Sequence, residues 1–434
     1  MNRSRVAFDP GPGSDVVAVR SVHPARAPRL ERQGEVIGGL LRCYPVSFLV
    51  LAPYALLILP MAVLNDNPRT GFIMVLVGLA LLGSVSVETA CLFLGRPDPQ
   101  WRRGMRRATA RYPRLYPVAR LVVLISIAAE LSGAYLGEGN LVAQISGETS
   151  DTPMVALTKL FSGWAALGFA LLVASHLGGH LSKAKLYGWL GALVGTKAVV
   201  TVLTALTAPL IAFVFFAVTA GVVCGVFRLR YLVFGTLMLV LLWPAMFDYR
   251  NGIREDQGIR VDDAVTATDR MRLDRQLTVV ADTEVPVDLG QPEGVDYLRY
   301  GLVPRILDQG RPALMTGQQI NRYLGGSRTS ASNFLLLGNM WFFDGPVGVV
   351  AVHAFWAGFV ALLLRWRGRP GPARLCLVCL VFSDALLWSG TYPDSMIGFL
   401  QHVVSATAVF ILLWLTRGLP VRVPARPARG VGSG

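Results

Sequence analysis

Ten runs of apolar residues, each about 17 to 25 residues long, limit the possible folds of this chain more than any other feature. A helix rises about 1.5 Å per residue, so one such run crosses the hydrocarbon core of a bilayer. The runs lie at 46–64, 71–94, 118–137, 156–175, 186–206, 208–227, 231–247, 346–364, 375–391 and 397–415. The sequence therefore predicts an all-α, polytopic integral membrane protein with about ten transmembrane helices.

Composition and charge agree with this prediction. Of 434 residues, 53% are hydrophobic and only 16% are charged, which is unlike a soluble domain. The net charge of +14 is typical of nucleic-acid-binding proteins as well, but here the basic residues gather in short loops between apolar runs. That distribution follows the positive-inside rule, so we expect membrane lipids and no nucleic acid among the partners.

Loop charges also predict the orientation. The loop 95–117 contains seven arginines and one acidic residue, Asp98, which places it in the cytoplasm, and the other basic loops alternate correctly with it. Ten crossings then put both termini in the cytoplasm. The predicted regions are a disordered N-terminal tail at 1–45 without a signal-peptide core, seven helices in 46–247, an extracytoplasmic loop at 248–345, three helices in 346–415 and a tail at 416–434.

The loop 248–345 is predicted to be a polar subdomain. It holds eleven arginines against fourteen acidic residues, so it is near neutral. Its first part, 250–290, reads as short amphipathic helix, and the apolar run 334–343 is too short to span and suggests a re-entrant or interfacial segment. The two halves of the chain differ in loop pattern, which argues against the inverted repeats of many transporters.

Within this loop, the stretch 297–333 concentrates arginines among Pro, Gly and aromatic residues. Guanidinium groups on a turn-rich backbone suit bidentate binding of an anion such as phosphate. Aromatic side chains could stack on sugars, and the small polar residues that follow could bind hydroxyls. Alternatively, this is a solvated loop whose arginines pair with Asp296 and Asp308. The candidate residues are Tyr297, Arg299, Arg305, Asp308, Arg311, Tyr323, Arg328 and Asn333.

Charges inside the predicted helices form a second group. A Lys or Asp at a helix centre costs about 2.5 to 3.5 kcal/mol on the insertion scale, so each needs a reason. Lys197 lies mid-helix, and its expected partner is Glu130, Asp384 or a pyrophosphate entering from the side. His353 and His402 are lone helical histidines, for which hydrogen bonding in the core is the favoured interpretation over catalysis.

No sequence motif calls for a metal or cofactor. Cys376 and Cys379 form a C-x-x-C at the start of an apolar helix, without the further ligands that a zinc site needs. Walker, Rossmann, nucleophile-elbow and H-E-x-x-H motifs are absent from the sequence. We therefore expect neither a metal site nor a cofactor.

The stretch 297–349 resembles the O-antigen polymerase (Wzy-type) family of oligosaccharide repeat-unit polymerases. The resemblance rests on PRIL at 304–307, the later Pro312 and TG at 316–317, the small polar SRTSASN, and the G-x-x-W-F-F-D-G-P-V-G entry into a helix. The family's G-E acidic position is Asn339 here, so an acid or base role at that position is not carried over, and Asp344 cannot be assumed to replace it.

The resemblance implies a bacterial inner-membrane glycosyltransferase related to the GT-C type, without a metal. It would move a glycan from undecaprenyl pyrophosphate onto a new lipid-linked repeat unit, with a chain-length regulator and a flippase as candidate partners. Arg299, Arg305 and Arg311 would stabilise the pyrophosphate charge, with Asp308 or Asp296 as base. Arg270 and Lys197 are lesser candidates for substrate binding. Competing hypotheses are an O-antigen ligase-like transferase, a lipid-linked glycan transporter and a scaffold protein.

Overall fold

The structure, a computed structural model, describes most of the chain between residues 38 and 418. The described ranges are 38–95, 101–136, 153–204, 206–256, 266–292, 294–303, 307–308, 316–326, 332–365 and 371–418. Within them every regular element is a helix, which confirms the all-α prediction. The predicted disorder of the N-terminal tail concerns residues that fall largely outside these ranges, as does most of the C-terminal tail.

Seven helices in the described residues are long and apolar enough to cross a membrane. They agree with seven of the ten predicted runs to within a few residues. Two helices are longer than their runs: α12 continues after its run, and α17 begins before its run. They are Pro45–Leu64 (α2, η1 and α3), Thr70–Leu94 (α4), Leu115–Tyr135 (α6), Lys183–Thr204 (α10), Leu229–Tyr249 within α12 (Leu229–Asp256), Leu335–Arg365 (α17) and Asp394–Leu415 (α19).

The other three predicted spans correspond to shorter or interrupted helices. The run 156–175 forms α8 (Pro153–Ser162) and α9 (Trp164–Leu177). The run 208–227 forms α11 (Ala208–Val223), which begins with a proline in its first turn, where a missing N–H costs nothing. The run 375–391 is covered by α18 (Pro372–Leu380) and the π-helix η4 (Val381–Ala385). The count of ten spans therefore stays a prediction.

Helix α9 lies at the centre of the bundle. All of its residues except His176 are buried, and it packs against α6, α10 and α18. Its sequence, WAALGFALLVASHL, is rich in small residues, which let helix backbones approach closely where no hydrophobic effect drives association. Gly168 shows this directly, because a Cβ atom there would overlap the Val123 side chain of α6.

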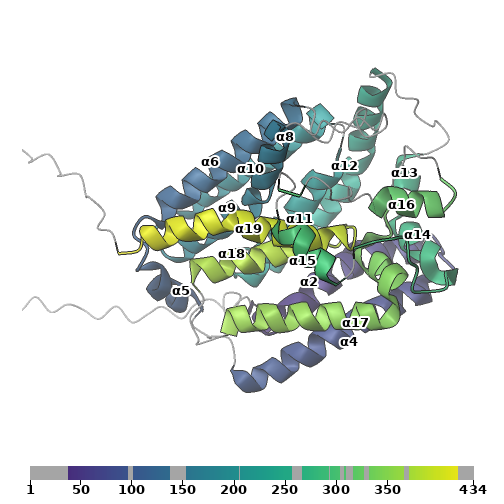
Figure 1. The fold of residues 1–434 in the computed structure, drawn as a ribbon, viewed down its shortest axis with the longest axis horizontal. Helices are drawn as coiled ribbons and strands as arrows, with labels where there is room; N and C mark the ends of the chain where they lie inside the picture. The colour runs from purple at the N-terminus through teal and green to yellow at the C-terminus, as the bar shows by residue number, and fades with distance from the viewer. Residues whose placement is uncertain are drawn as a thin grey trace, which may run out of the picture.

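The two ends of the bundle differ. At one end, on the left of Figure 1, α5 (Trp101–Thr109) buries Trp101 and Met105 and exposes four arginines. At the other end, on the right of Figure 1, lie α13 (Ala267–Arg270), α14 (Leu273–Thr278) and α16 (Thr316–Tyr323). We call these the basic end and the loop end.

Helices α4 and α17 pack side by side along the lower edge of Figure 1. Gly83 of α4 lies against the backbone of Val350 in α17, and a Cβ atom there would overlap the Val350 carbonyl oxygen. Near the basic end, the buried Glu88 carboxylate accepts the backbone N–H of Val46 at 2.8 Å and the Ser47 hydroxyl at 2.5 Å. Arg365 of α17 donates to the Glu88 carbonyl oxygen at 3.0 Å, so three helices are joined here.

Residues of the predicted loop pack onto the bundle as short helices. Asp274 of α14 is fully buried and accepts a hydrogen bond from Asn67 at 2.7 Å, and Asp282 pairs with Arg69. The predicted helix in 250–290 is therefore seen as the end of α12, α13, α14 and the 3-10 helix η2 (Val279–Asp282). The stretch 297–333, predicted to be turn-rich, contains part of α15 (Val295–Leu302) and all of α16.

Helix α17 consists of two segments. Gly345 has φ 65° and ψ −165°, a conformation almost restricted to glycine, and divides the apolar run that begins at Leu335 from the spanning segment. Leu335 also has a positive φ of 60°. Its neighbour Leu336 donates its N–H to the Trp388 carbonyl oxygen at 3.0 Å. The short segment predicted before this span is thus helical and is attached to the turn that precedes α19.

Candidate functional site

Helix α15 carries two candidate residues to the loop end of α19. Gln401 of α19 donates to the carbonyl oxygen of Tyr300 at 2.9 Å. Gly301 faces Leu400 so closely that a Cβ atom would overlap the leucine side chain. These contacts fix α15 against α19 and so determine the positions of Tyr297 and Arg299.

Arg299 and Asp308 form a bidentate ion pair. The guanidinium Nε and Nη2 atoms donate to the two carboxylate oxygens, each at 2.8 Å. Arg299 is 49% exposed and Asp308 14% exposed, and the carboxylate raises the pKa of Arg299. Asp308 is one of the two acidic partners named in the ion-pair alternative, and the role of Arg299 in binding a phosphate stays a prediction. The pair joins the two ends of the segment that contains PRIL.

A buried tyrosine joins three parts of the chain at the same place. The Tyr392 side chain lies close to Asp344, at the kink of α17, and to Tyr297 of α15, and both affect its pKa. Burial raises the pKa of Tyr392 far above its ordinary value, and the neighbouring Tyr297 and Asp344 raise it further. Tyr392 therefore stays protonated as a donor, while Asp344 is exposed and accessible. We call Tyr297, Arg299, Asp308, Asp344 and Tyr392 the loop-end site.

Three further hydrogen bonds hold the segments around the loop-end site. Thr316, the threonine of the TG motif, donates its hydroxyl to Asp394 at the start of α19 at 2.5 Å. Ser332 donates its N–H to the Gly317 carbonyl oxygen at 2.9 Å and its hydroxyl to Asn321 at 2.8 Å. The TG motif and the small polar stretch after it thus meet at the loop end.

Asn333, predicted to bind substrate, is hydrogen-bonded within the protein, and its role in substrate binding stays a prediction. It donates to the Ser389 carbonyl oxygen at 2.8 Å and accepts from the Leu335 N–H at 2.9 Å and from Asn339 at 2.6 Å. Asn339 is fully buried, and its side-chain oxygen has no hydrogen-bond partner among the described residues. These amides tie the start of α17 to the turn at 388–390.

Among the remaining loop candidates, the structure describes the side chain of Tyr323. Tyr323 is 49% exposed, and its ring is nearly perpendicular to that of Phe342, with centroids 5.2 Å apart. Arg305, Arg311 and Arg328 lie outside the described residues, and so does the side chain of Arg270.

Lys197 is part of a buried ion pair. Its Nζ atom lies 2.9 Å from Oε1 of Glu130 on α6, one of the expected partners, and 5.7 Å from the Phe213 ring centroid. Their side chains are 17% and 7% exposed. This pairing removes the need for a pyrophosphate to balance the lysine, and the proposed substrate role of Lys197 stays a prediction.

A second polar pair was missed by sequence reasoning, which treated its members separately. The ring Nδ1 of His402 lies 3.0 Å from Oδ2 of Asp384 in η4. A Cβ atom on Gly163, at the break between α8 and α9, would overlap the His402 ring, so this glycine makes room for it. The only signal in the sequence was an Asp in one apolar run and a His in the next. The pair could not be predicted from it, because the sequence does not show how either helix is rotated about its axis.

Comparisons with known proteins add no relative. No family model matches the chain, and no curated protein or solved structure matches it. Fold and composition define the class: an all-helical, membrane-embedded protein with seven helices of spanning length among the described residues.

Proposed function

We propose that the protein is a membrane glycan polymerase related to the GT-C type of glycosyltransferases. It would transfer an oligosaccharide from undecaprenyl pyrophosphate onto a lipid-linked repeat unit in the assembly of a bacterial surface polysaccharide. The protein would lie in the cytoplasmic membrane with both termini inside, so that the loop end faces outward. The sequence resemblance at 297–349 suggests this activity.

One structural observation supports the proposal most directly. Residues from α15, the α17 kink and the turn before α19 converge on the loop-end site, at the end of the bundle where a lipid-linked sugar would lie. The site combines an exposed carboxylate, Asp344, with the partly exposed ring of Tyr297, which can stack on a sugar. The bidentate pair of Arg299 and Asp308 closes the segment that contains Arg305.

The proposed chemistry assigns a task to each group. The acceptor hydroxyl attacks the anomeric carbon, the bond from that carbon to the pyrophosphate oxygen breaks, and its electron pair stays on the pyrophosphate. Arg305 and Arg311 stabilise this developing negative charge. The hydroxyl proton passes to a carboxylate, for which Asp344 is better placed than Asp308, because Asp308 is bound to Arg299.

The test is deletion of the gene, followed by analysis of surface glycan by gel. The deletion strain is complemented with wild type, Arg305→Ala, Asp344→Asn or the control Arg322→Ala, which changes an exposed arginine of α16. We expect the deletion strain to display single repeat units without long polymer. Wild type and the control should restore long polymer, whereas neither site variant should. In a membrane assay, Arg305→Ala should lower the rate of glycan transfer about 100-fold. Loss of one charge-stabilising donor has an effect of this size in other enzymes.

Other outcomes would contradict the proposal in distinct ways. Unchanged polymer length after deletion excludes a polymerase. Polymer that is made but not attached to its final acceptor indicates a ligase. Loss of all surface glycan with lipid-linked units accumulating inside the cell indicates a transporter.

A further inference from the structure

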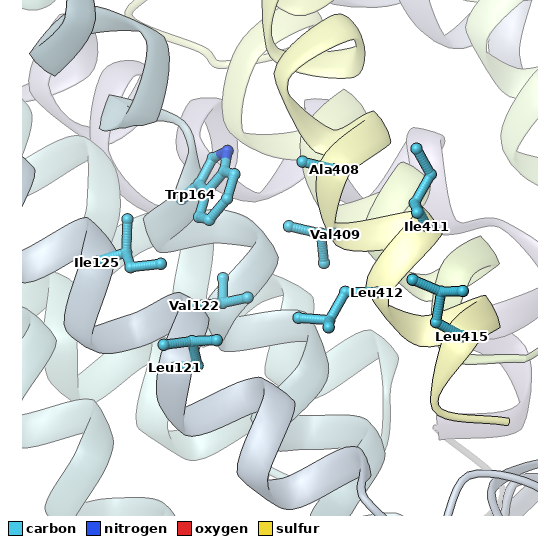
Figure 2. A pocket seen from close by; sticks show the side chains of 9 residues that line it. All are labelled: Leu121, Val122, Ile125, Trp164, Ala408, Val409, Ile411, Leu412 and Leu415. Atoms are coloured by element: carbon cyan, nitrogen blue, oxygen red, sulfur yellow. The ribbon is translucent and has the colours of Figure 1, made fainter. Parts of the chain in front are cut away.

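An apolar groove lies between α6 and α19 on the outer surface of the bundle. The groove has a volume of about 290 Å³. Figure 2 shows its lining side chains on both helices, with Trp164 of α9 at one end. Its lining side chains are all apolar: Leu121, Val122, Ile125, Trp164, Ala408, Val409, Ile411, Leu412 and Leu415. Val122 and Val409 are each 1% exposed and form its floor, whereas Ile411 and Leu415 are more than half exposed at its edge.

The groove extends from the basic end toward the middle of the bundle. Leu415 is the last residue of α19, and Ala408 is seven residues before it, which is about 10 Å along the helix axis. Trp164 begins α9, near the midpoint of the α8 and α9 pair. Because these helices belong to a membrane-embedded bundle, the surrounding solvent is hydrocarbon, and a groove without polar atoms suits a hydrocarbon chain.

The mouth of the groove is positively charged. The N–H of Gly418, just after α19, donates to the carbonyl oxygen of Arg111 at 3.1 Å, which brings the ends of α6 and α19 together. Arg114 is exposed and precedes Leu121 by seven residues, so it lies on the same face of α6 as the groove. Arg417 is exposed as well, and the segments 111–125 and 405–418 contain no Asp or Glu.

We infer that this groove binds an anionic phospholipid of the leaflet at the basic end. One acyl chain lies along the groove, and the phosphate is bound by Arg111, Arg114 and Arg417. The charge complements a phosphate, and the groove lies where the chain attached to that phosphate would enter the bilayer. A lipid-linked sugar would have its phosphates at the loop end, so this lipid is not the proposed substrate, and the inference does not depend on the proposed activity.

The test uses the full-length protein in detergent, with lipid retention measured by native mass spectrometry. Phosphatidylglycerol and phosphatidylcholine with identical acyl chains are offered in equal amounts. We expect the wild type to retain phosphatidylglycerol preferentially. Arg111→Gln combined with Arg114→Gln should lower this retention about 30-fold, given about 1 kcal/mol for each arginine near a charged headgroup.

A second variant tests the acyl chain separately from the charge. Ala408→Trp fills the groove without changing a basic residue, and it should lower retention of phosphatidylglycerol as well. The matched control, Lys185→Gln, removes an exposed basic charge from α10 and should change nothing. Melting temperatures of all variants in lipid-free detergent show whether each remains folded.

The following results would overturn the inference. Equal retention of the two lipids would show that the arginines do not select charge. Unchanged retention in folded Ala408→Trp would show that the groove does not hold the chain. Displacement of phosphatidylglycerol by inorganic phosphate or by a short isoprenoid phosphate, but not by a second anionic phospholipid, would assign the site to another ligand.

Discussion

At the scale of single residues, two pairs of ionisable side chains lie inside the bundle. Lys197 with Glu130 and His402 with Asp384 each join two separate helical elements of the membrane-embedded bundle. The free-energy cost of transferring a charge into hydrocarbon explains this arrangement, because burying a paired charge costs less free energy than burying an isolated one. These pairs fix the rotation of α10 relative to α6 and of α19 relative to η4.

The ion pair predicts a non-additive effect of mutation on stability. Lys197→Met should destabilise the protein by about 3 kcal/mol, the lower end for breaking a buried pair, because Glu130 can take up a proton. The double variant Lys197→Met with Glu130→Leu should recover most of this loss. Thermal unfolding in one detergent measures both, with Lys185→Met on the exposed first turn of α10 as the control. Additive losses would contradict a coupled pair.

The sequence was sufficient to identify candidate residues but not their partners. For Lys197 the sequence left Glu130, Asp384 and a pyrophosphate as possible partners, and the structure shows Glu130. Arg299 could not be separated from an ordinary surface arginine, since the contact with Asp308 depends on how the chain turns between them. Asn333 was assigned to substrate because small polar loops bind hydroxyls, but in the structure its amide N–H donates to the Ser389 carbonyl oxygen and its amide oxygen accepts from the Leu335 N–H.

At the scale of helices, close packing depends on particular glycines. Gly83→Ala should destabilise the protein by about 1–3 kcal/mol, because the new methyl group would force α4 and α17 apart at Val350. Gly78→Ala, on the same helix with nothing within 4 Å of the new Cβ, is the control and should be neutral or slightly stabilising. Unfolding curves of the two variants compare them directly, and equal losses would exclude the tight contact.

Apolar runs predicted where most helices lie, because membrane helices need continuous apolar length. They predicted one interruption, between the short apolar run 334–343 and the span that begins at 346, where Gly345 divides α17. They did not predict the break at Gly163, which falls inside the run 156–175 and makes room for His402. The helices α15 and α16 were not predicted either, because they are eight residues each and are stabilised by docking rather than by their own composition.

At the scale of the whole molecule, the number of crossings decides which side of the membrane each end occupies. Between residues 288 and 418 the ten-span prediction has three crossings, whereas the seven helices of spanning length give two. We therefore expect residues 288 and 418 on opposite sides. Alkaline phosphatase fused after 288 should be active, and green fluorescent protein fused after 418 should fluoresce, with a fusion after 110 as the cytoplasmic reference. Both reporters on one side would favour the smaller count.

The docking of the loop onto the last helix also has a consequence for biosynthesis. A ribosome completes the loop well before α19, yet the contacts that hold the second part of the loop are made by Trp388, Tyr392, Asp394, Leu400 and Gln401. Asn67 and Arg69 can hold the first part as soon as it is made, whereas α15 and α16 can dock only after α19 has been made and inserted. A premature stop codon just before Trp388 would leave Tyr297, Arg299 and Asp308 in the chain and still abolish the arrangement that positions them.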